Sequence, residues 1–232
     1  MYPFVETIRI EQGSARLLPL HEERLNRTRR EALGLADPIA LAPAIERAWR
    51  EYASTLVLPE GPSPASASRP AGGRRADDGR TPIYKCRVLY KAAIERIEFA
   101  LYTPPLITSL LLAQADDLDY THKSTDRTRL ASLHDLATQR GASDALIVRR
   151  GLVTDTTFCN VAFSADGLTW VTPARPLLRG VMREHLLRTG RIVEGDIAAD
   201  AIRSYRSVRL FNAMNEFGGL EIGVADILKS HL

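Results

Sequence analysis

The chain has 232 residues, of which 45% are hydrophobic, 25% charged and 6% aromatic. This composition is typical of a globular protein with one sizeable core or two small packed domains, and it excludes a disordered chain, a collagen and a coiled coil. No apolar run approaches the roughly 18 to 20 residues of a membrane-spanning helix, so we expect no membrane association. The first residues have neither a basic start nor an apolar stretch, which predicts a cytoplasmic protein without a secretory signal.

The charged residues and the cysteines narrow the class of partner. Thirty-one lysines and arginines face 28 acidic residues, leaving a formal net charge of +3, and the basic residues are spread along the chain. Such spreading argues against a nucleic-acid partner. Cys86 and Cys159 are far apart in apolar, strand-like segments, and we expect both to be buried free thiols. The five histidines show no ligand spacing, so no metal site is predicted.

The pattern of apolar residues in the first half predicts strands and helices of an α/β (α+β) protein. Residues 59–80, rich in Gly, Pro, Ser and charge, predict a mobile surface insertion. The other predicted elements are strands 4–10 and 15–18, a helix 21–33 capped by Gly34, a helix 38–53 entered through Asp37 and Pro38, and strands 84–90 and 97–101.

After Thr103-Pro104-Pro105 the order of predicted elements changes, and we place a domain boundary there, between residues 1–103 and 104–232. No internal repeat is visible. The elements predicted beyond the boundary are strands 110–113, 145–148, 152–163, 168–171 and 208–213, a helix 130–137 followed by Gly141, a helix 180–188 that starts at Gly180, and a short helix 199–205.

Four polar positions attract attention: Arg24 on the first helix, Lys123 in a hydroxyl-rich loop, Asp155 on a strand, and the helix start at Gly180. Each has an ordinary interpretation. A lysine in a loop or an arginine on a helix usually faces water, and an aspartate after a turn usually caps backbone amides. A helix N-terminus can hold an anion, but most such ends bind only water.

In their order along the chain, these positions resemble the class IV aminotransferases, the fold-type IV enzymes that use pyridoxal phosphate. The matching segments are Phe-Val-Glu-Thr-Ile-Arg at residues 4–9 (the family's first inner strand), His-Glu-Glu-Arg-Leu at 21–25 (its H-x-x-R-L helix), Lys123 (its cofactor lysine), Gly-Leu-Val-Thr-Asp at 151–155 with Asn160 (its G-x-V-T-E strand), and Thr172-Pro173 with Gly-Val-Met-Arg at 180–183 (its T-P and G-I-M-R). The resemblance implies two small domains with the cofactor between them, and a homodimer.

The resemblance also assigns roles. Lys123 would bond to the cofactor's aldehyde and move the substrate's proton. Asp155 would accept the pyridine N–H so that the ring can take up electrons, and Arg24 would clamp the phosphate. The further cofactor contacts implied are the backbone amides of Val181 and Met182, at a helix N-terminus, and Asn212 in a late strand-end loop.

Two departures from the family pattern bear on these roles. The family usually has glutamate where this chain has Asp155, one methylene shorter, so the ring would sit closer or a water would intervene. The family also has a strand and a loop before its first inner strand. We expect that cover to be missing here or supplied by a dimer partner.

Within the family, the sequence looks closest to the 4-amino-4-deoxychorismate lyases, which carry threonine at the position of Thr7. The Thr7 hydroxyl could donate the proton that the departing enolpyruvyl group needs, which predicts release of pyruvate and 4-aminobenzoate, a step of folate biosynthesis. Thr7 could equally fill space in a strand. The arginines that could bind the substrate's carboxylates are Arg9, Arg127 and Arg183.

Two alternatives stay open. A class IV aminotransferase acting on branched-chain or D-amino acids would share the cofactor residues and return the proton to the cofactor instead. A non-catalytic relative, serving as a binding module, would fit the short N-terminus and the Asp155 substitution.

Overall fold

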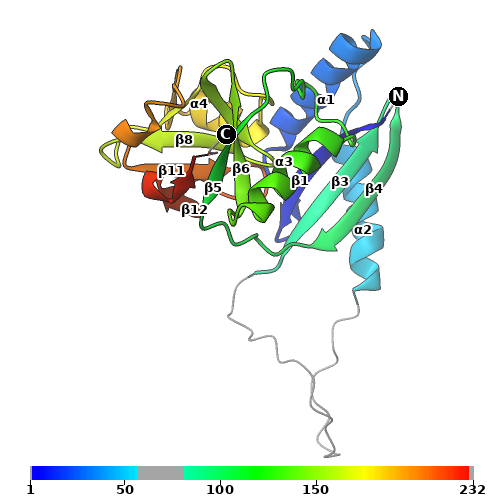
Figure 1. The fold of residues 1–232 in the computed structure, drawn as a ribbon. Helices are drawn as coiled ribbons and strands as arrows, with labels where there is room; N and C mark the ends of the chain where they lie inside the picture. The colour runs from blue at the N-terminus through cyan, green and yellow to red at the C-terminus, as the bar shows by residue number, and fades with distance from the viewer. Residues whose placement is uncertain (1, 57–80, 230–232) are drawn as a thin grey trace, which may run out of the picture.

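The computed structural model describes residues 2–56 and 81–229, and within them the chain forms three β-sheets and four α-helices. Figure 1 shows the sheet of the first hundred residues on one side and the two later sheets on the other. The insertion predicted at residues 59–80 lies outside the described residues. Among the residues described, no helix is both long and apolar enough to cross a membrane.

The first sheet is antiparallel throughout, in the order β2-β1-β3-β4. Its elements are β1 (Phe4–Glu11), β2 (Ser14–Ala15), β3 (Ile83–Tyr90) and β4 (Ile94–Leu101), with helices α1 (Leu18–Leu33) and α2 (Ala42–Thr55). On β1, Ile8 and Ile10 are buried in one cluster with Leu25 of α1 and Ile45 of α2. Because side chains alternate along a strand, Thr7 points to the opposite face, and this face lines the cavity described below.

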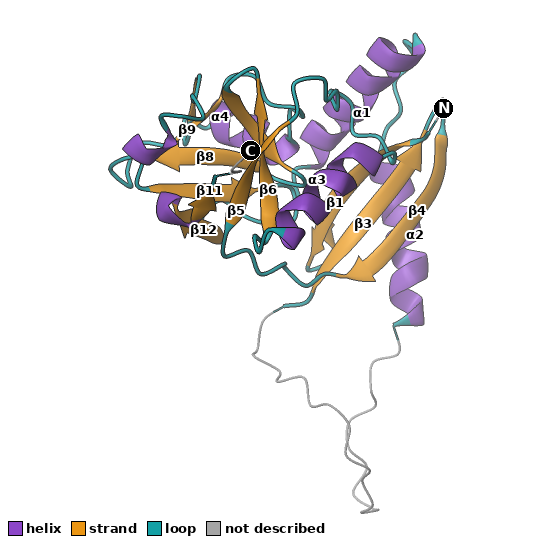
Figure 2. Ribbon diagram, in the orientation of Figure 1, coloured by secondary structure: helices purple, strands orange, loops and turns teal. Residues whose placement is uncertain are grey.

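The rest of the chain builds two sheets, in the orders β13-β5-β6-β7 and β10-β9-β8-β11-β12, drawn as orange arrows in Figure 2. Their elements are β5 (Leu110–Gln114), α3 (Thr128–Gln139), β6 (Asp144–Arg149), β7 (Leu152–Thr156), β8 (Asn160–Ser164), β9 (Val171–Pro173), α4 (Val181–Arg188), β10 (Val193–Gly195), β11 (Ser207–Phe211), β12 (Leu220–Gly223) and β13 (Ile227–Leu228), with short 3₁₀ turns at Ile202–Ser204 and Val224–Asp226.

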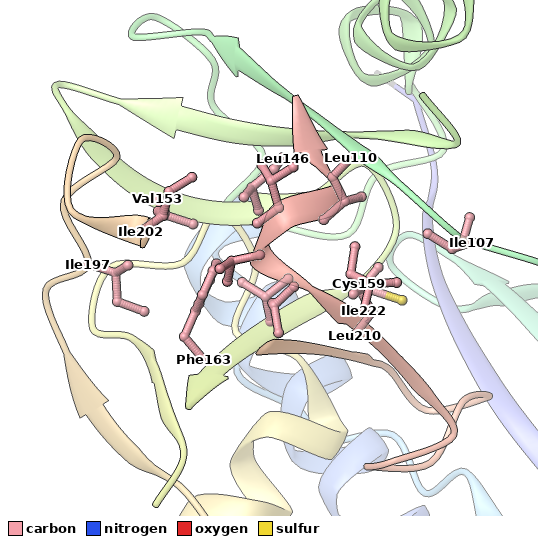
Figure 3. Close-up of a cluster of buried hydrophobic side chains, with 14 residues drawn as sticks. Ile107, Leu110, Leu146, Val153, Cys159, Phe163, Ile197, Ile202, Leu210 and Ile222 are labelled. Carbon is pink, nitrogen blue, oxygen red and sulfur yellow. The ribbon is translucent and has the colours of Figure 1, made fainter. Parts of the chain in front are cut away.

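These two sheets share one apolar core. Leu110 and Leu146 from one sheet pack in the same buried cluster as Phe163, Leu210 and Ile222 from the other, as Figure 3 shows. The core fixes the position of β7 relative to β8. The turn between these strands forms part of the cavity wall.

Several sequence predictions are confirmed. The fold is mixed α/β, both cysteines are buried free thiols, and α4 begins just after Gly180. Helix α1 ends at Gly34, whose φ of +68° is the left-handed conformation that glycine adopts at low cost. The predicted domain boundary after residue 103 stays a prediction; that position lies in the connection between β4 and β5.

The predicted start of the second helix is wrong, because α2 begins at Ala42 and not at Pro38. Side chains of α1 hold the preceding segment in a non-helical path. The Asn26 side chain binds both the N–H and the carbonyl of Ile39, and the Glu22 carboxylate accepts the Leu41 N–H. These contacts satisfy backbone groups that a helix would otherwise use.

The predicted strand 152–163 is two strands in different sheets, β7 and β8. The Thr156 N–H donates to the Cys159 carbonyl, and the Thr156 hydroxyl accepts the Cys159 N–H, which closes a tight turn between the strands. The strand predicted at 168–171 lies instead at Val171–Pro173, and the helix predicted at 199–205 is only the 3₁₀ turn Ile202–Ser204. Strands β10, β12 and β13 were not predicted, because they are short.

Candidate active site

A cavity of about 300 Å³ lies between the first sheet and the two later ones. It is lined from β1, α1, β3, the loop before α3, the β7–β8 turn, the start of α4 and the loop after β11. Most of the site residues predicted from the sequence line this cavity. The nominated residues that line the cavity are Thr7, Arg24, Lys123, Arg127, Asp155, Val181 and Asn212. Those that do not line it are Arg9, Met182 and Arg183.

Backbone hydrogen bonds to the first strand hold the loop that carries Lys123. The Val5 N–H donates to the Lys123 carbonyl at 2.9 Å, and the Thr125 N–H donates to the Pro3 carbonyl at 2.9 Å. The Tyr120 hydroxyl adds a bond of 2.6 Å to the Ser124 carbonyl. The amine-bearing loop is therefore fixed on both sides of Lys123.

The Lys123 amine is easier to deprotonate than an ordinary lysine. Burial, together with the positive charges of Arg24 and Arg127, lowers its pKa to about 8. A large fraction of the amine is therefore neutral near pH 8, and a neutral amine is what both nucleophilic attack and proton abstraction require.

Arg24 is held by a carboxylate that the sequence reasoning missed, Glu6. The Glu6 side chain is fully buried and accepts two hydrogen bonds from Arg24, from Nε at 2.9 Å and from Nη2 at 2.6 Å. His21 Nδ1 lies 2.6 Å from the same carboxylate. Burial alone would raise the pKa of Glu6, but the Arg24 charge and the His21 hydrogen bond outweigh it and bring the pKa to about 2.

This pairing decides which part of Arg24 faces the cavity. Nε and Nη2 are bound to Glu6, whereas Nη1 has no hydrogen bond to a described residue. A guanidinium fixed in this way presents its remaining N–H groups in one direction. Arg24 is therefore pre-oriented for an anion in the cavity.

Asp155 is held at the far wall of the cavity by two donors. Its Oδ1 accepts from Asn160 Nδ2 at 2.8 Å, and its Oδ2 accepts from the Leu178 N–H at 2.9 Å. Burial raises the pKa of Asp155 to about 6, against the lowering effect of these two hydrogen bonds. Gly180 is required beside this pair, because a Cβ at Gly180 would collide with Asn160 Oδ1.

The loop after β11 is fixed by its own polar groups. Asn212 Nδ2 donates to the Phe158 carbonyl at 3.1 Å, and Asn212 Oδ1 accepts the Met214 N–H at 2.8 Å. Arg9 reaches this loop from outside the cavity, where Nη1 donates to the Met214 carbonyl at 3.2 Å and Nη2 donates to the Glu11 carboxylate at 3.1 Å. The Asn212 side chain therefore shapes the wall, and Arg9 supports the loop.

Arg183 and Met182 also lie away from the cavity surface. Arg183 is buried and its Nη2 donates to the Pro173 carbonyl at 2.9 Å and to the Glu194 carboxylate at 2.6 Å. The Met182 side chain packs on a separate apolar cluster that contains Trp170. The geometry thus places Arg183 and Arg9 in internal ion pairs and not at a substrate carboxylate.

The sequence reasoning also missed Lys85 and Arg87 of β3, which line the cavity. Their alternation with apolar residues predicted a strand but gave them no role in the site. The register of β3 on β1, which pairs Arg87 with Thr7 and Lys85 with Arg9, brings their face of the strand to the cavity. Among the residues described, no group of three His, Cys, Asp or Glu side chains could hold a metal ion.

Comparison with known proteins gives consistent results. The model of the amino-transferase class IV family matches residues 4–220. An uncharacterized protein of Haemophilus influenzae is 30% identical over 216 residues, which cover 93% of this chain and 99% of that one. The crystal structure of a candidate 4-amino-4-deoxychorismate lyase from Haemophilus somnus is 26% identical, with a TM-score of 0.75, over 93% of this chain and 98% of that chain.

A hypothetical aminotransferase from Mycobacterium tuberculosis in its pyridoxal-phosphate-bound form is similar in fold alone, with a TM-score of 0.69 and 16% identity over 93% of this chain and 79% of that chain. The residues in this cavity fit such a cofactor. Lys123 supplies a partly neutral amine, Asp155 a carboxylate for a ring N–H, and Arg24 an Nη1 group that no described residue binds. No side chain among the described residues caps helix α4, so its first backbone N–H groups can bind a phosphate.

We predict that Glu6→Gln weakens binding of pyridoxal phosphate much more than binding of pyridoxal, which lacks the phosphate. The change removes the charge that orients Arg24, and a hydrogen bond to a charged group is worth about 1.5–3 kcal/mol, or roughly tenfold or more in affinity. Titration of the cofactor-free protein by absorbance measures both affinities. Glu95→Gln, which alters a carboxylate on β4 that pairs with Lys91 away from the cavity, is the control and should change neither. An equal loss of both affinities would show that Glu6 only stabilises the fold.

We also predict that acetylation of Lys123 by acetic anhydride in the cofactor-free protein rises with pH around a midpoint near 8, because only the neutral amine reacts. Arg127→Gln should move this midpoint upward, since it removes a neighbouring positive charge. Arg129→Gln, at a surface pair with Asp117, should not. Peptide mass spectrometry measures the modified fraction. A midpoint near about 10.4, the value for an ordinary lysine, would contradict the burial of the amine.

Proposed function

The chain belongs to the class IV aminotransferase family of pyridoxal-phosphate-dependent enzymes, and within it we propose a lyase that converts 4-amino-4-deoxychorismate to 4-aminobenzoate and pyruvate. The similarity to the candidate lyase of Haemophilus somnus supports this choice. The product 4-aminobenzoate would place the enzyme in folate biosynthesis. We also propose that the enzyme is a homodimer and that it is located in the cytoplasm.

One observation carries the choice of reaction: Thr7 lines the same cavity as Lys123. Thr7 lies on the cavity face of β1, and its hydroxyl makes no hydrogen bond to a described residue. A threonine hydroxyl with only a structural role in a strand would be stabilised by a hydrogen bond to a nearby backbone group. Its proton is therefore available to a substrate.

The residues divide the chemistry between them. When bound, pyridoxal phosphate withdraws electrons from the carbon that carries the substrate's amine, which makes that carbon acidic. Arg24 and the first amides of α4 hold the phosphate, and Asp155 accepts the ring N–H. Lys123, partly neutral near pH 8, takes the proton from C4 of the substrate ring.

Thr7 then acts on the leaving group. As the C3–O bond of the substrate breaks, the Thr7 hydroxyl donates a proton to the methylene carbon of the enolpyruvyl group, which becomes the methyl group of pyruvate. The ring loses one proton to Lys123 and the leaving group gains one from Thr7, and transfer of the proton from Lys123 to Thr7 restores both side chains. The two products contain all the atoms of the substrate. Formation of the aromatic ring drives the elimination.

An aminotransferase for branched-chain or D-amino acids would use the same cofactor residues but has no need of the Thr7 hydroxyl. The two reactions therefore differ in their demand on one side chain. They also differ in their substrates, since only transamination consumes a keto acid.

We predict that the purified enzyme releases pyruvate from 4-amino-4-deoxychorismate without added keto acid, measured by coupling to lactate dehydrogenase. Thr7→Val should reduce this rate by about 10²–10⁴, the usual contribution of a general acid, whereas Thr7→Ser, which keeps the hydroxyl, should retain much of it. Turnover of L- or D-amino acids with 2-oxoglutarate, with no pyruvate from the chorismate derivative, would overturn the lyase assignment. Full activity of Thr7→Val would remove Thr7 from the mechanism.

A further inference from the structure

A second, smaller cavity lies beside the end of the large cavity at which Arg24 and the start of α4 meet. Its volume is about 20 Å³, and three of its lining residues, Arg24, Gly180 and Val181, also line the large cavity. Helices α1 and α4 contact each other here. The second cavity therefore borders the place where this chain's residues fit the phosphate of the cofactor.

Two carboxylates line the second cavity, and each lies next to a group that would bind the phosphate. Glu23 directly precedes Arg24 on α1, and Glu184 lies in the first turn of α4. A carboxylate in the first turn of a helix is attracted to the bare N–H groups there, so it competes with any other anion for them. If these two carboxylates were free, they would repel a phosphate and compete for the groups that bind it.

Arg188, in the last turn of α4, binds both carboxylates. Its Nη1 and Nη2 donate to the two oxygens of Glu23 at 3.3 and 2.8 Å, and its Nε donates to Glu184 Oε1 at 2.8 Å. The pair with Glu23 is bidentate, which is the strongest arrangement of a guanidinium and a carboxylate. The pair with Glu184 spans four residues of one helix, a spacing at which side chains of successive turns meet. One guanidinium thus occupies both carboxylates and joins α1 to α4.

The other cations of the second cavity are left without these two partners. Arg27 and Arg179 also line it, and neither makes an ion pair with a described residue. Arg24 is bound to Glu6 through Nε and Nη2 only. Because Arg188 takes both acids of this cavity, Arg27, Arg179 and the Nη1 group of Arg24 stay available to an anionic ligand.

We propose that Arg188 is a positioning residue for the cofactor phosphate, because it holds Glu23 and Glu184 away from the phosphate and from the groups that bind it. Arg188 does not line the large cavity, so it acts through the two carboxylates and not by touching the cofactor. This role concerns cofactor binding alone. It is the same for a lyase and for an aminotransferase.

Absorbance titration of the cofactor-free protein with pyridoxal phosphate and with pyridoxal tests the proposal. Arg188→Gln should weaken binding of pyridoxal phosphate about three- to tenfold at low salt, since it releases two carboxylates near the phosphate, and should leave pyridoxal binding unchanged. Arg191→Gln removes a positive charge just after the same helix and is the control. Arg191 stacks over Phe217 and lines neither cavity, so this variant should change neither affinity.

A triple variant separates this role from a purely structural one. Glu23→Gln, Glu184→Gln and Arg188→Gln together remove the two carboxylates as well as the guanidinium, so the affinity for pyridoxal phosphate should return at least to the wild-type value. An Arg188 that only joined α1 to α4 would give no such return. The three side chains are partly exposed, and exposed ion pairs contribute little to stability, so these variants should fold.

Salt provides an independent readout. At about 1 M salt the Debye length is only about 3 Å, so the difference in pyridoxal phosphate affinity between the wild type and Arg188→Gln should disappear. Three results would overturn the inference: wild-type affinity of Arg188→Gln at low salt, an equal loss for pyridoxal, or a loss that persists in the triple variant. Absence of pyruvate release would overturn the lyase assignment alone, because an aminotransferase needs the same phosphate site.

Discussion

The functional cavity depends on a short backbone pairing between the first strand and the loop that carries Lys123. The bonds from Val5 to Lys123 and from Thr125 to Pro3 join the N-terminal sheet to the rest of the chain. They place the amine beside the strand face that presents Thr7. Without this pairing, the groups on the two sides of the cavity would belong to separate surfaces.

Charge balance then sets the reactivity of the site. The Glu6 carboxylate balances the positive charge of Arg24 and is buried away from water. No comparable anion among the described residues offsets Lys85 or Arg127 at the cavity. The excess positive charge and the burial together keep Lys123 partly neutral. The same excess favours anionic ligands, so one imbalance serves both amine reactivity and recognition.

The sequence allowed prediction of the groups that share motifs with the family, and Lys123, Arg24 and Asp155 do line one cavity. It did not reveal Glu6, because a carboxylate inside an apolar strand has no local signal for a partner eighteen residues away on a helix. Lys85 was missed for a related reason. Alternation identifies two strand faces but does not say which one meets water.

Arg9 and Arg183, which were predicted to bind the substrate, show the same limit of prediction from local sequence. Arg183 follows the Gly-Val-Met motif, yet its partner Glu194 lies on a short strand that the sequence did not predict. The broken strand 152–163 likewise depended on a Thr156 side chain that closes a turn. Contacts of this kind are set by tertiary packing and not by local pattern. The homodimer stays a prediction.

The identity of the reacting amine is the central claim, and reduction of the cofactor-loaded enzyme with borohydride tests it most directly. The reduction makes the bond between the cofactor and the protein permanent, so that peptide mapping by mass spectrometry locates it. The account predicts that the peptide containing Lys123 carries a pyridoxyl group in the wild type. The Lys123→Ala variant should carry no pyridoxyl group. A pyridoxyl group on Lys85, the other lysine of the cavity, or on no lysine at all, would contradict it.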